Sequence, residues 1–233
     1  MAFYKEDVEI DISTEIKVEK DVSSQSFAVP KKPVYSFFKR LTDIVISALG
    51  LIILAIPFGI LCIVILIDSP GASPIYKQIR VGKNGKEFAF YKFRSMIPKA
   101  EERLKEILEE NEMDGPAFKM ENDPRITRVG KFIRKTSIDE FPQLWNVLKG
   151  DMSLVGPRPP LPREVEKYTE EQKIRLAITP GITCYWQVQP KRNSLTFDQW
   201  VELDVKYIKE RSYLTDIKIF FKTFKAVFGM EGQ

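Results

Sequence analysis

The chain has 233 residues, enough for one folded domain with a real core, and its 36 basic and 32 acidic residues leave a net charge of only +4. This balance gives no reason to expect a nucleic-acid partner. No histidine is present, which excludes a histidine-containing triad, imidazole acid–base chemistry and His-ligated zinc. The two cysteines, Cys62 and Cys184, form no CxxC motif, so a reducing, cytosolic setting is expected.

The first 33 residues mix acids, lysines and serines without a sustained apolar pattern. We expect a flexible tail here. A cleaved signal peptide is not expected, because the start is acidic and polar.

An uncharged segment of 24 residues follows, from Ile44 to Ile67. As a helix it would be about 36 Å long, against about 30 Å for the apolar core of a bilayer. An ordinary transmembrane helix is one interpretation. The other is a re-entrant hairpin, because Pro57 lies near the middle of the segment and removes a backbone hydrogen bond there.

The charges on either side of this segment favour the hairpin. Four basic residues precede it and four follow it, so neither end is marked for export. They are Lys31, Lys32, Lys39 and Arg40 before the segment, and Lys77, Arg80, Lys83 and Lys86 after it.

The rest of the chain predicts a mainly helical α+β domain. Residues 79–93 alternate around the turn at 82–85 and indicate a small β-hairpin. Helices are predicted over 98–112, 138–149, 161–177 and 196–210, with loops at 150–160 and 179–194. Residues 213–230 place phenylalanines on one helical face and lysines on another, which is typical of an interfacial amphipathic helix; a core-facing helix is the alternative. We therefore expect a tail over 1–33, a membrane-inserted helix over 34–68 and a catalytic domain over 69–233.

The acidic pair Asp139-Glu140 stands at the predicted start of a helix that Gly150 can end. On local grounds a capping box between Ser137 and Glu140 explains these acids as well as catalysis does. The surroundings shift the balance, because basic residues lie on both sides of the pair: Arg125, Arg128, Arg134 and Lys135 before it and Arg158 after it. Two carboxylates among arginines suit a phosphate held through Mg²⁺, so phosphoryl transfer is the expected chemistry.

Three stretches closely resemble the bacterial sugar transferases, which are polyprenol-phosphate phosphoglycosyl transferases. They are Lys-Phe-Arg-Ser-Met at 92–96, Ser-Ile-Asp-Glu-Phe-Pro-Gln-Leu at 137–144 and Leu-Lys-Gly-Asp-Met-Ser-Leu-Val-Gly-Pro-Arg-Pro at 148–159. The resemblance covers about residues 36 to 228. It implies a small monotopic enzyme of the bacterial inner membrane, with a re-entrant helix and a compact catalytic domain on the cytoplasmic face.

The same resemblance implies a reaction and a set of site residues. Asp139 would attack the β-phosphate of a UDP-sugar, expel UMP and pass the sugar phosphate to undecaprenyl phosphate, with Glu140 assisting in metal or proton handling and Mg²⁺ as cofactor. Lys39 and Arg40, just before the apolar segment, would meet lipid head groups or the carrier phosphate at the membrane surface. Pro57, at the helix break, is the third residue expected to contact the membrane. Substrate or phosphate contacts are implied for Arg94, Arg134, Arg158, Gln187, Arg192 and Asp204.

Two departures from the family pattern leave the substrate open. Ile56-Pro57 stands where the family commonly has Ser-Pro, and Cys184 to Asn193 differs from the usual Gly-Trp-Ala-Gln-Val-Asn-Gly-Arg-Asn. The rival interpretations are a catalytically inactive membrane-tethered assembly protein and a glycosyltransferase that moves the sugar without its phosphate, although the chain has no DxD motif. The sugar, the glycan pathway and the choice between monomer and homodimer stay open.

Overall fold

The computed structural model describes residues 29–107, 111–112, 115–118, 120, 122–189 and 192–228, and most of the tail expected over 1–33 lies outside them. The chain forms a mainly helical α+β fold with one small antiparallel strand pair, as predicted. In chain order the elements are α1 (Pro33–Asp68), β1 (Ile75–Val81), β2 (Glu87–Phe93), α2 (Arg128–Lys135), α3 (Gln143–Lys149), β3 (Ser153–Val155), α4 (Pro162–Val165), β4 (Gly181–Thr183), α5 (Phe197–Glu210) and α6 (Tyr213–Phe228).

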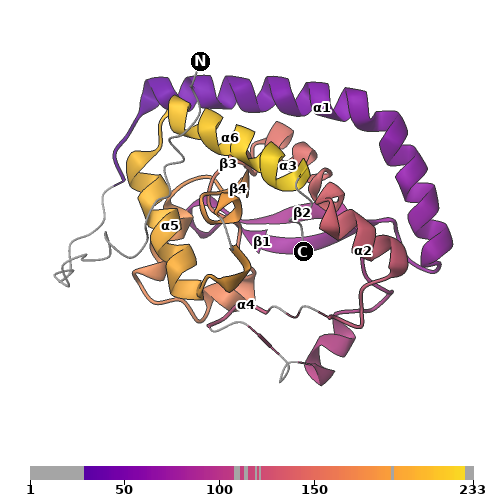
Figure 1. Cartoon of the computed structure of the whole chain (residues 1–233). Coiled ribbons are helices and arrows are strands. Elements are labelled where there is room, and N and C mark those ends of the chain that lie inside the picture. The colour runs from indigo at the N-terminus through magenta and orange to yellow at the C-terminus, as the bar shows by residue number, and fades with distance from the viewer. Residues whose placement is uncertain are drawn as a thin grey trace, which may run out of the picture.

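Helix α1 dominates the outline of the molecule. Its 36 residues would extend about 54 Å if straight, well beyond the roughly 30 Å of a bilayer core. Figure 1 shows instead that α1 runs along one edge of the molecule beside α6 and then turns, so that its second part descends beside α2. Pro57 lies inside the helix, where its missing N–H and its ring account for such a bend.

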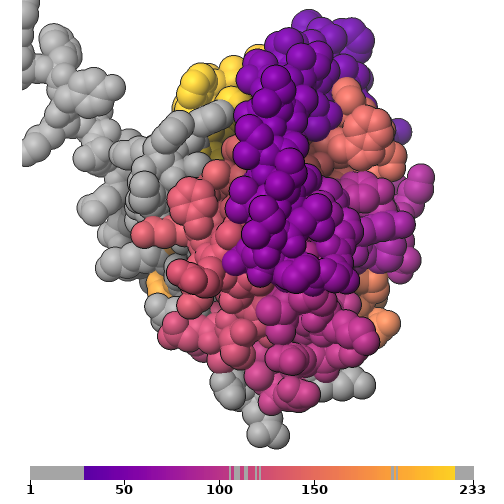
Figure 2. Space-filling view, turned by 90° about the vertical axis from the view of Figure 1, so that its right-hand side faces the viewer, coloured from indigo at the N-terminus to yellow at the C-terminus, as the bar shows by residue number. Residues whose placement is uncertain are grey.

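Most of the α1 surface is apolar and exposed. Of the residues that the structure describes, only α1 forms a helix long and apolar enough to cross a membrane. Figure 2 shows its second part as a ridge on the surface of the molecule. The exposed apolar side chains continue onto α6, where Tyr213, Leu214, Ile217 and Phe221 are exposed while Ile219 is buried. The predicted helix is confirmed, and it combines features of both alternatives: α6 packs on the domain through Ile219 and leaves an apolar strip exposed.

Both parts of α1 are hydrogen-bonded to the same domain. In the first part, Arg40 donates to the carbonyl oxygens of Val147 and Leu148 at the end of α3, at 2.6 and 2.8 Å. The buried Asp43 accepts a hydrogen bond from the backbone N–H of Leu154 in β3 at 3.0 Å.

The far end of α1 is held in the same way. Asp68 accepts from the backbone N–H of Val129 in α2 at 3.2 Å, and Arg94, just after β2, donates to the carbonyl oxygen of Ser69. These two contacts and those of Arg40 and Asp43 are called the four ties below. They connect α1 to α3, β3, α2 and the end of β2.

The two sheets are small, and both contribute side chains to the main core. Strands β1 and β2 pair antiparallel from Ile75 opposite Phe93 to Val81 opposite Glu87, which confirms the predicted hairpin. Strands β3 and β4 pair in parallel, with Ser153 opposite Gly181. The main core packs Phe88 and Phe90 of β2 against α3, β3, α5 and α6; its buried members also include Val147, Met152, Leu154, Val155, Tyr207 and Ile219.

Several local predictions were wrong or incomplete. The stretches expected as loops at 150–160 and 179–194 contain β3 and β4. Among the described residues of 98–112 the structure has a 3₁₀ turn over Glu102–Glu106 in place of the predicted helix. The helix predicted over 161–177 divides into α4 and a 3₁₀ turn over Gln172–Ala177. Helix α5 is confirmed, and Thr196 caps it in a reciprocal pair of hydrogen bonds with Gln199.

Candidate active site

The segment that carries Asp139 and Glu140 is a tight connection between α2 and α3. The Thr127 hydroxyl accepts the Gly130 N–H at 2.9 Å and starts α2, which ends at Lys135. Ser137 then adopts a left-handed conformation with φ of 56°, and the chain makes one 3₁₀ turn over Ile138–Glu140.

This geometry corrects the predicted helix start. The Ser137 side chain makes no capping hydrogen bond, and α3 begins only at Gln143, so the capping box between Ser137 and Glu140 is absent. Gly150 does end α3, with φ of +94°. Capping therefore no longer explains why two acids stand at 139 and 140.

The Asp139 carboxyl is buried among cations. Only 7% of the residue is exposed, and burial raises the pKa of its carboxyl above the usual range. The positive charges of Lys92, Arg134 and Arg158 all act in the opposite direction and lower that pKa. The Asp139 carboxylate is thus buried and close to three positive charges. A bound phosphate could interact with the same three cations.

Glu140 shares this environment. The residue is half-buried, and the pKa of its carboxyl is raised by burial and next by the charge of Asp139. Arg158, Lys92 and Arg192 lower the same pKa. The two acids therefore oppose each other's ionisation, and a further positive charge between them would relieve the repulsion.

The cations come from three separate elements. Lys92 lies in β2, Arg134 lies in the last turn of α2, and Arg158 follows β3. Helix α2 lies hard against the segment after β2, since a Cβ at Gly130 would be 1.9 Å from the Ser95 carbonyl oxygen. This close approach brings Lys92 and Arg134 to the same carboxyl. The Nη1 atom of Arg134 is buried and has no hydrogen-bond partner among the described residues.

Arg158 is placed by a stiff loop. The loop 156–160 starts where Gly156 touches β4, and a Cβ at Gly156 would lie 2.6 Å from the Thr179 carbonyl oxygen. At the other end of the loop the buried Arg80 donates to the carbonyl oxygen of Pro159 at 3.0 Å. Arg158 itself is exposed, so its guanidinium is open to a ligand.

A cavity of about 920 Å³ adjoins these cations and is lined by Lys92, Arg134 and Arg158 among others. Its walls carry ten basic and five acidic residues, so the cavity suits a ligand with several negative charges. The basic residues are Lys77, Arg80, Lys92, Arg94, Lys99, Arg125, Arg134, Arg158, Arg163 and Arg175.

Lys92 and Arg80 were not among the predicted site residues. Burial lowers the pKa of Lys92 to about 8, and the charges of Arg134, Arg80 and Arg158 contribute in the same direction while Asp139 opposes them. The signal was present in the strand alternation, because positions 88, 90 and 92 share one face and only the last is charged. The alternation therefore places the Lys92 side chain on the same face of β2 as the buried Phe88 and Phe90, and not on the solvent face.

The other predicted substrate residues are divided between the cavity and the core. Arg94 lines the cavity but ties the end of α1, and Arg192 is close enough to Glu140 to lower the pKa of its carboxyl. Asp204 is fully buried and accepts from Arg175 Nε at 2.7 Å, so it lies beneath the cavity and not beside Asp139. Gln187 accepts from the Cys184 thiol, and its backbone carbonyl accepts from Arg192.

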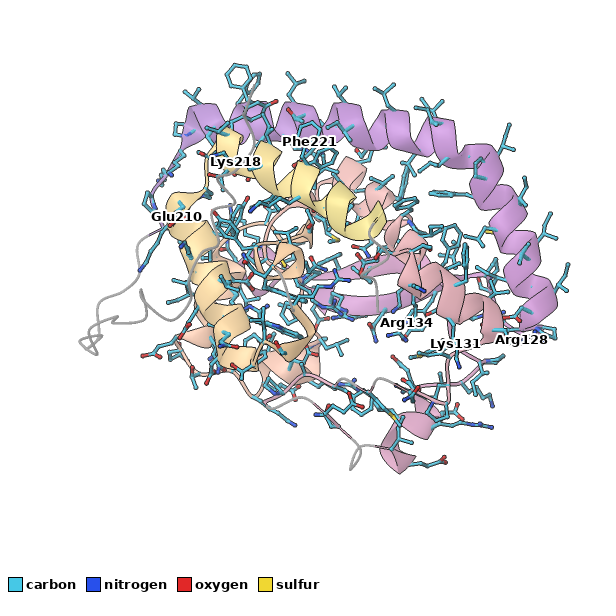
Figure 3. The ribbon with its side chains drawn as sticks, in the orientation of Figure 1. Arg128, Lys131, Arg134, Glu210, Lys218 and Phe221 are labelled. Carbon is cyan, nitrogen blue, oxygen red and sulfur yellow. The ribbon has the colours of Figure 1, made fainter. Side chains whose placement is uncertain are left out.

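The predicted lipid-contacting residues make protein contacts in this structure. Lys39 forms an ion pair with Asp216 of α6 at 2.7 Å, and Arg40 holds the end of α3. Pro57 lines an open, mainly apolar groove between the second part of α1 and α2. Figure 3 shows Arg128, Lys131 and Arg134 along one side of α2.

Fold and site together define a class of protein: a small domain tied to a long apolar helix, with a buried carboxylate pair beside a basic cavity. The chain belongs to the bacterial sugar transferase family, whose model matches residues 34–230.

Named relatives agree with this assignment. The chain is 53% identical over 191 residues to the galactosyl transferase CpsE of Streptococcus agalactiae, covering 81% of this chain and 42% of that protein. It is 47% identical over 200 residues to the undecaprenyl-phosphate galactose phosphotransferase of Salmonella typhimurium, covering 84% and 41%. It is 36% identical over 214 residues to the exopolysaccharide production protein ExoY of Rhizobium meliloti, covering 88% and 94%. The chain thus spans about two fifths of the first two relatives and nearly all of the third.

Proposed function

We propose that this protein transfers a sugar 1-phosphate from a UDP-sugar to undecaprenyl phosphate, an early membrane step of polysaccharide or glycoconjugate assembly. The observation that carries the proposal is the Asp139 carboxyl, buried beside Lys92, Arg134 and Arg158 next to a basic cavity. The relative from Salmonella typhimurium is named for such a phosphotransfer, with galactose as the sugar.

The proposed reaction has two displacements at one phosphorus atom. In the first, a carboxylate oxygen of Asp139 bonds to the β-phosphorus of the UDP-sugar, and the bond to the bridging oxygen breaks so that UMP leaves with that electron pair. In the second, an oxygen of undecaprenyl phosphate bonds to the same phosphorus and the Asp139 oxygen leaves. The products are undecaprenyl-diphosphate-sugar and the free carboxylate. Lys92, Arg134 and Arg158 hold the phosphate oxygens in both steps.

The donor set of the site fits Mg²⁺, which we propose as cofactor. Among the described residues there is no group of three or more His, Cys, Asp or Glu side chains that could form a complete metal cage. Mg²⁺ commonly needs only one or two carboxylates besides substrate phosphates, and Asp139 with Glu140 supplies two that repel each other. The ion would neutralise phosphate charge as Asp139 approaches, and Glu140 would hold it or a proton.

We further propose that α1 is a re-entrant membrane hairpin and that the domain lies on the cytoplasmic face of the inner membrane. Arg40 near one end of α1 and Asp68 at the other contact the same domain. A helix that crossed the bilayer would put those contacts on opposite sides. The bend of α1 in Figure 1, the presence of Pro57 inside the helix and its exposed apolar surface support the hairpin.

The activity is tested by the nucleotide that is released. The full chain in lipid nanodiscs is incubated with undecaprenyl phosphate, Mg²⁺ and a panel of UDP-sugars that begins with UDP-galactose. UMP release supports the proposal, whereas UDP release, or no nucleotide release with any UDP-sugar, overturns it. Asp139→Asn should lower the rate by about 10³-fold or more, and the exposed Asp198→Asn of α5 is the matched control.

Two further measurements test the finer parts. Without the lipid acceptor, a burst of about one UMP per chain, with a matching mass increase on the Asp139 peptide, is expected for the covalent intermediate. For the topology, single cysteines in place of Lys31 and Lys86 should both react with an impermeant reagent from the cytoplasmic side only. Reaction from opposite sides would rule out the hairpin.

A further inference from the structure

Two groups of side chains with different chemistry line the cavity and are called its two ends below. One group is Lys92, Arg134 and Arg158, whose positive charges act on the Asp139 carboxyl. The other end is lined by aromatic rings: Tyr168, Trp186, Phe197 and Trp200. These rings are buried and close together, and the Trp186 and Trp200 rings stack with centroids 4.2 Å apart and an interplanar angle of 10°.

The aromatic end is nearly neutral. Its guanidinium, Arg175, lies 5.8 Å from the Tyr168 ring centroid and 5.6 Å from that of Phe197. The charge of Arg175 is already balanced by the buried Asp204 beneath it, at 2.7 Å. Phosphate therefore has less to gain here than at the Lys92 end, whereas a flat, uncharged ring finds aromatic and guanidinium surfaces.

Arg158 connects the two ends. It is near enough to Asp139 to lower the pKa of that carboxyl. Burial raises the pKa of Tyr168 to about 12, and Arg158 is among the positive charges that oppose this rise. Arg158 and Tyr168 both line the cavity, so the charge of Arg158 acts on a group at each end, and a phosphate that Arg158 binds can lie between them.

On the proposed reaction, the line of attack on the phosphorus determines the positions of the leaving nucleotide and of the sugar. In a phosphoryl displacement the attacking and leaving oxygens are roughly in line across the phosphorus. Because Asp139 attacks from one side, the leaving nucleotide must extend to the opposite side, past Arg158. The sugar projects sideways from the same phosphorus.

We propose that the aromatic end of the cavity, formed by Tyr168, Trp186, Phe197 and Trp200, is the nucleoside subsite and binds the pyrimidine base of the leaving nucleotide. A second observation points the same way: Trp186 and Trp200 are more than nine-tenths buried, and their indole N–H groups have no partner among the described residues. The carbonyl oxygens of a pyrimidine are acceptors of the kind these donors lack. This inference rests on the proposed function for the identity of the leaving group.

The chain has three tryptophans, which makes the subsite directly observable. Trp145 lies on α3 and is 49% exposed, so Trp145→Phe leaves only the stacked pair as tryptophan emitters. The full-length Trp145→Phe protein in nanodiscs is titrated with UMP, with inorganic pyrophosphate and with galactose 1-phosphate. UMP should change the emission of the pair, and the other two ligands should not. No change with UMP, or a change with galactose 1-phosphate that matches it, overturns the proposal.

Substitution of the pair gives an independent readout. Trp186→Phe and Trp200→Phe keep an aromatic ring and remove one N–H each, so UMP affinity by calorimetry should fall about threefold to tenfold while pyrophosphate affinity stays the same. Equal losses for both ligands, or unchanged UMP affinity, contradict the subsite. Trp145→Phe is the matched control and should bind UMP as the wild type does.

Failure of this inference is distinguishable from failure of the proposed function. If the wild type releases UMP from a UDP-sugar while UMP leaves the tryptophan pair unaffected, the transfer reaction stands and the subsite is wrong. If UMP changes the emission of the pair but no UDP-sugar yields UMP, the subsite stands and the proposed reaction is wrong.

Discussion

The charge on Lys92 should set the alkaline limit of activity. Burial and three neighbouring arginines bring the pKa of Lys92 from 10.5 to about 8. This lowered pKa means that the structure disfavours the charged ammonium by roughly 3 kcal/mol. One unit above its pKa only about a tenth of the protein would hold the ammonium, whereas about half holds it at the pKa itself. The ratio kcat/KM, which reports the free protein, should therefore fall about fivefold between pH 8 and pH 9 and about tenfold from its plateau at lower pH.

Replacing Lys92 by arginine tests this directly, because a guanidinium stays charged throughout this range. Lys92→Arg should lose the alkaline fall in kcat/KM, measured as UMP release from pH 6 to 10, even if its activity at pH 7 is lower. Lys86→Arg, in the exposed hairpin turn, is the matched control and should keep the wild-type profile. A Lys92→Arg profile that falls as the wild type does would refute the assignment of this charge to the site.

The same shift predicts an effect on stability with a definite sign. The folded pKa of Lys92 lies below the unfolded value, so the destabilising effect of burying its charge is complete below pH 8 and disappears as the pH rises toward 10.5. Lys92→Met should therefore raise the free energy of unfolding at pH 7 by up to about 3 kcal/mol while abolishing transfer. Denaturant unfolding at pH 7 and at pH 10 measures the gain in stability, and UMP release measures the loss of transfer. A Lys92→Met protein that is no more stable than the wild type at pH 7 would contradict the reasoning.

Three further outcomes follow from the packing. Gly130→Ala should prevent folding or activity, because its Cβ would lie 1.9 Å from a backbone oxygen. Gly59→Ala, whose Cβ has nothing within 4 Å, should express and unfold as the wild type does. Equal behaviour of the two variants would contradict this reasoning. Arg40→Met removes two hydrogen bonds to α3 carbonyl oxygens and should lower stability by about 2 kcal/mol in thermal unfolding, with an unchanged Tm as the opposing result. Asp204→Ala leaves its buried arginine partner unpaired and should destabilise the domain by about 3–5 kcal/mol in denaturant unfolding, so a loss below 1 kcal/mol would show that the pair contributes little.

Strong local periodicity was sufficient to predict much of the fold. The β-hairpin, α5 and α6 all follow from patterns within about fifteen residues, and their positions agree with the sequence. Strands β3 and β4 could not be found this way, since each has only three residues and they pair across the chain. Backbone hydrogen bonds hold them together, and these require a close approach that only glycine allows, because a Cβ at Gly181 would lie 2.0 Å from the Gly156 nitrogen. A glycine required by a distant backbone leaves no local signal.

The candidate site divides in the same manner. Asp139, Glu140, Arg134 and Arg158 stand in motifs that can be read from the sequence, and the structure brings them together. The partner of Asp204 could not be inferred, because Arg175 is 29 residues away and the pairing depends on how a 3₁₀ turn packs on α5. The contact of Arg40 with α3 could not be inferred for a similar reason. A basic residue beside an apolar segment predicts lipid contact, but Arg40 donates hydrogen bonds to carbonyl oxygens at the end of α3, more than 100 residues away in sequence.

The four ties have a consequence for how the protein is made. Each of them joins α1 to an element that carries or adjoins a site residue: α3 follows Asp139, β3 leads to Arg158, α2 ends with Arg134, and Arg94 follows Lys92. Helix α1 is synthesised before all of these elements. On our proposal that α1 enters the bilayer, it would already be inserted when its partners leave the ribosome. The site residues would then take their positions against a helix that is already anchored in the membrane. A shortened version that lacks α1 would lose the four ties that connect the elements carrying these residues.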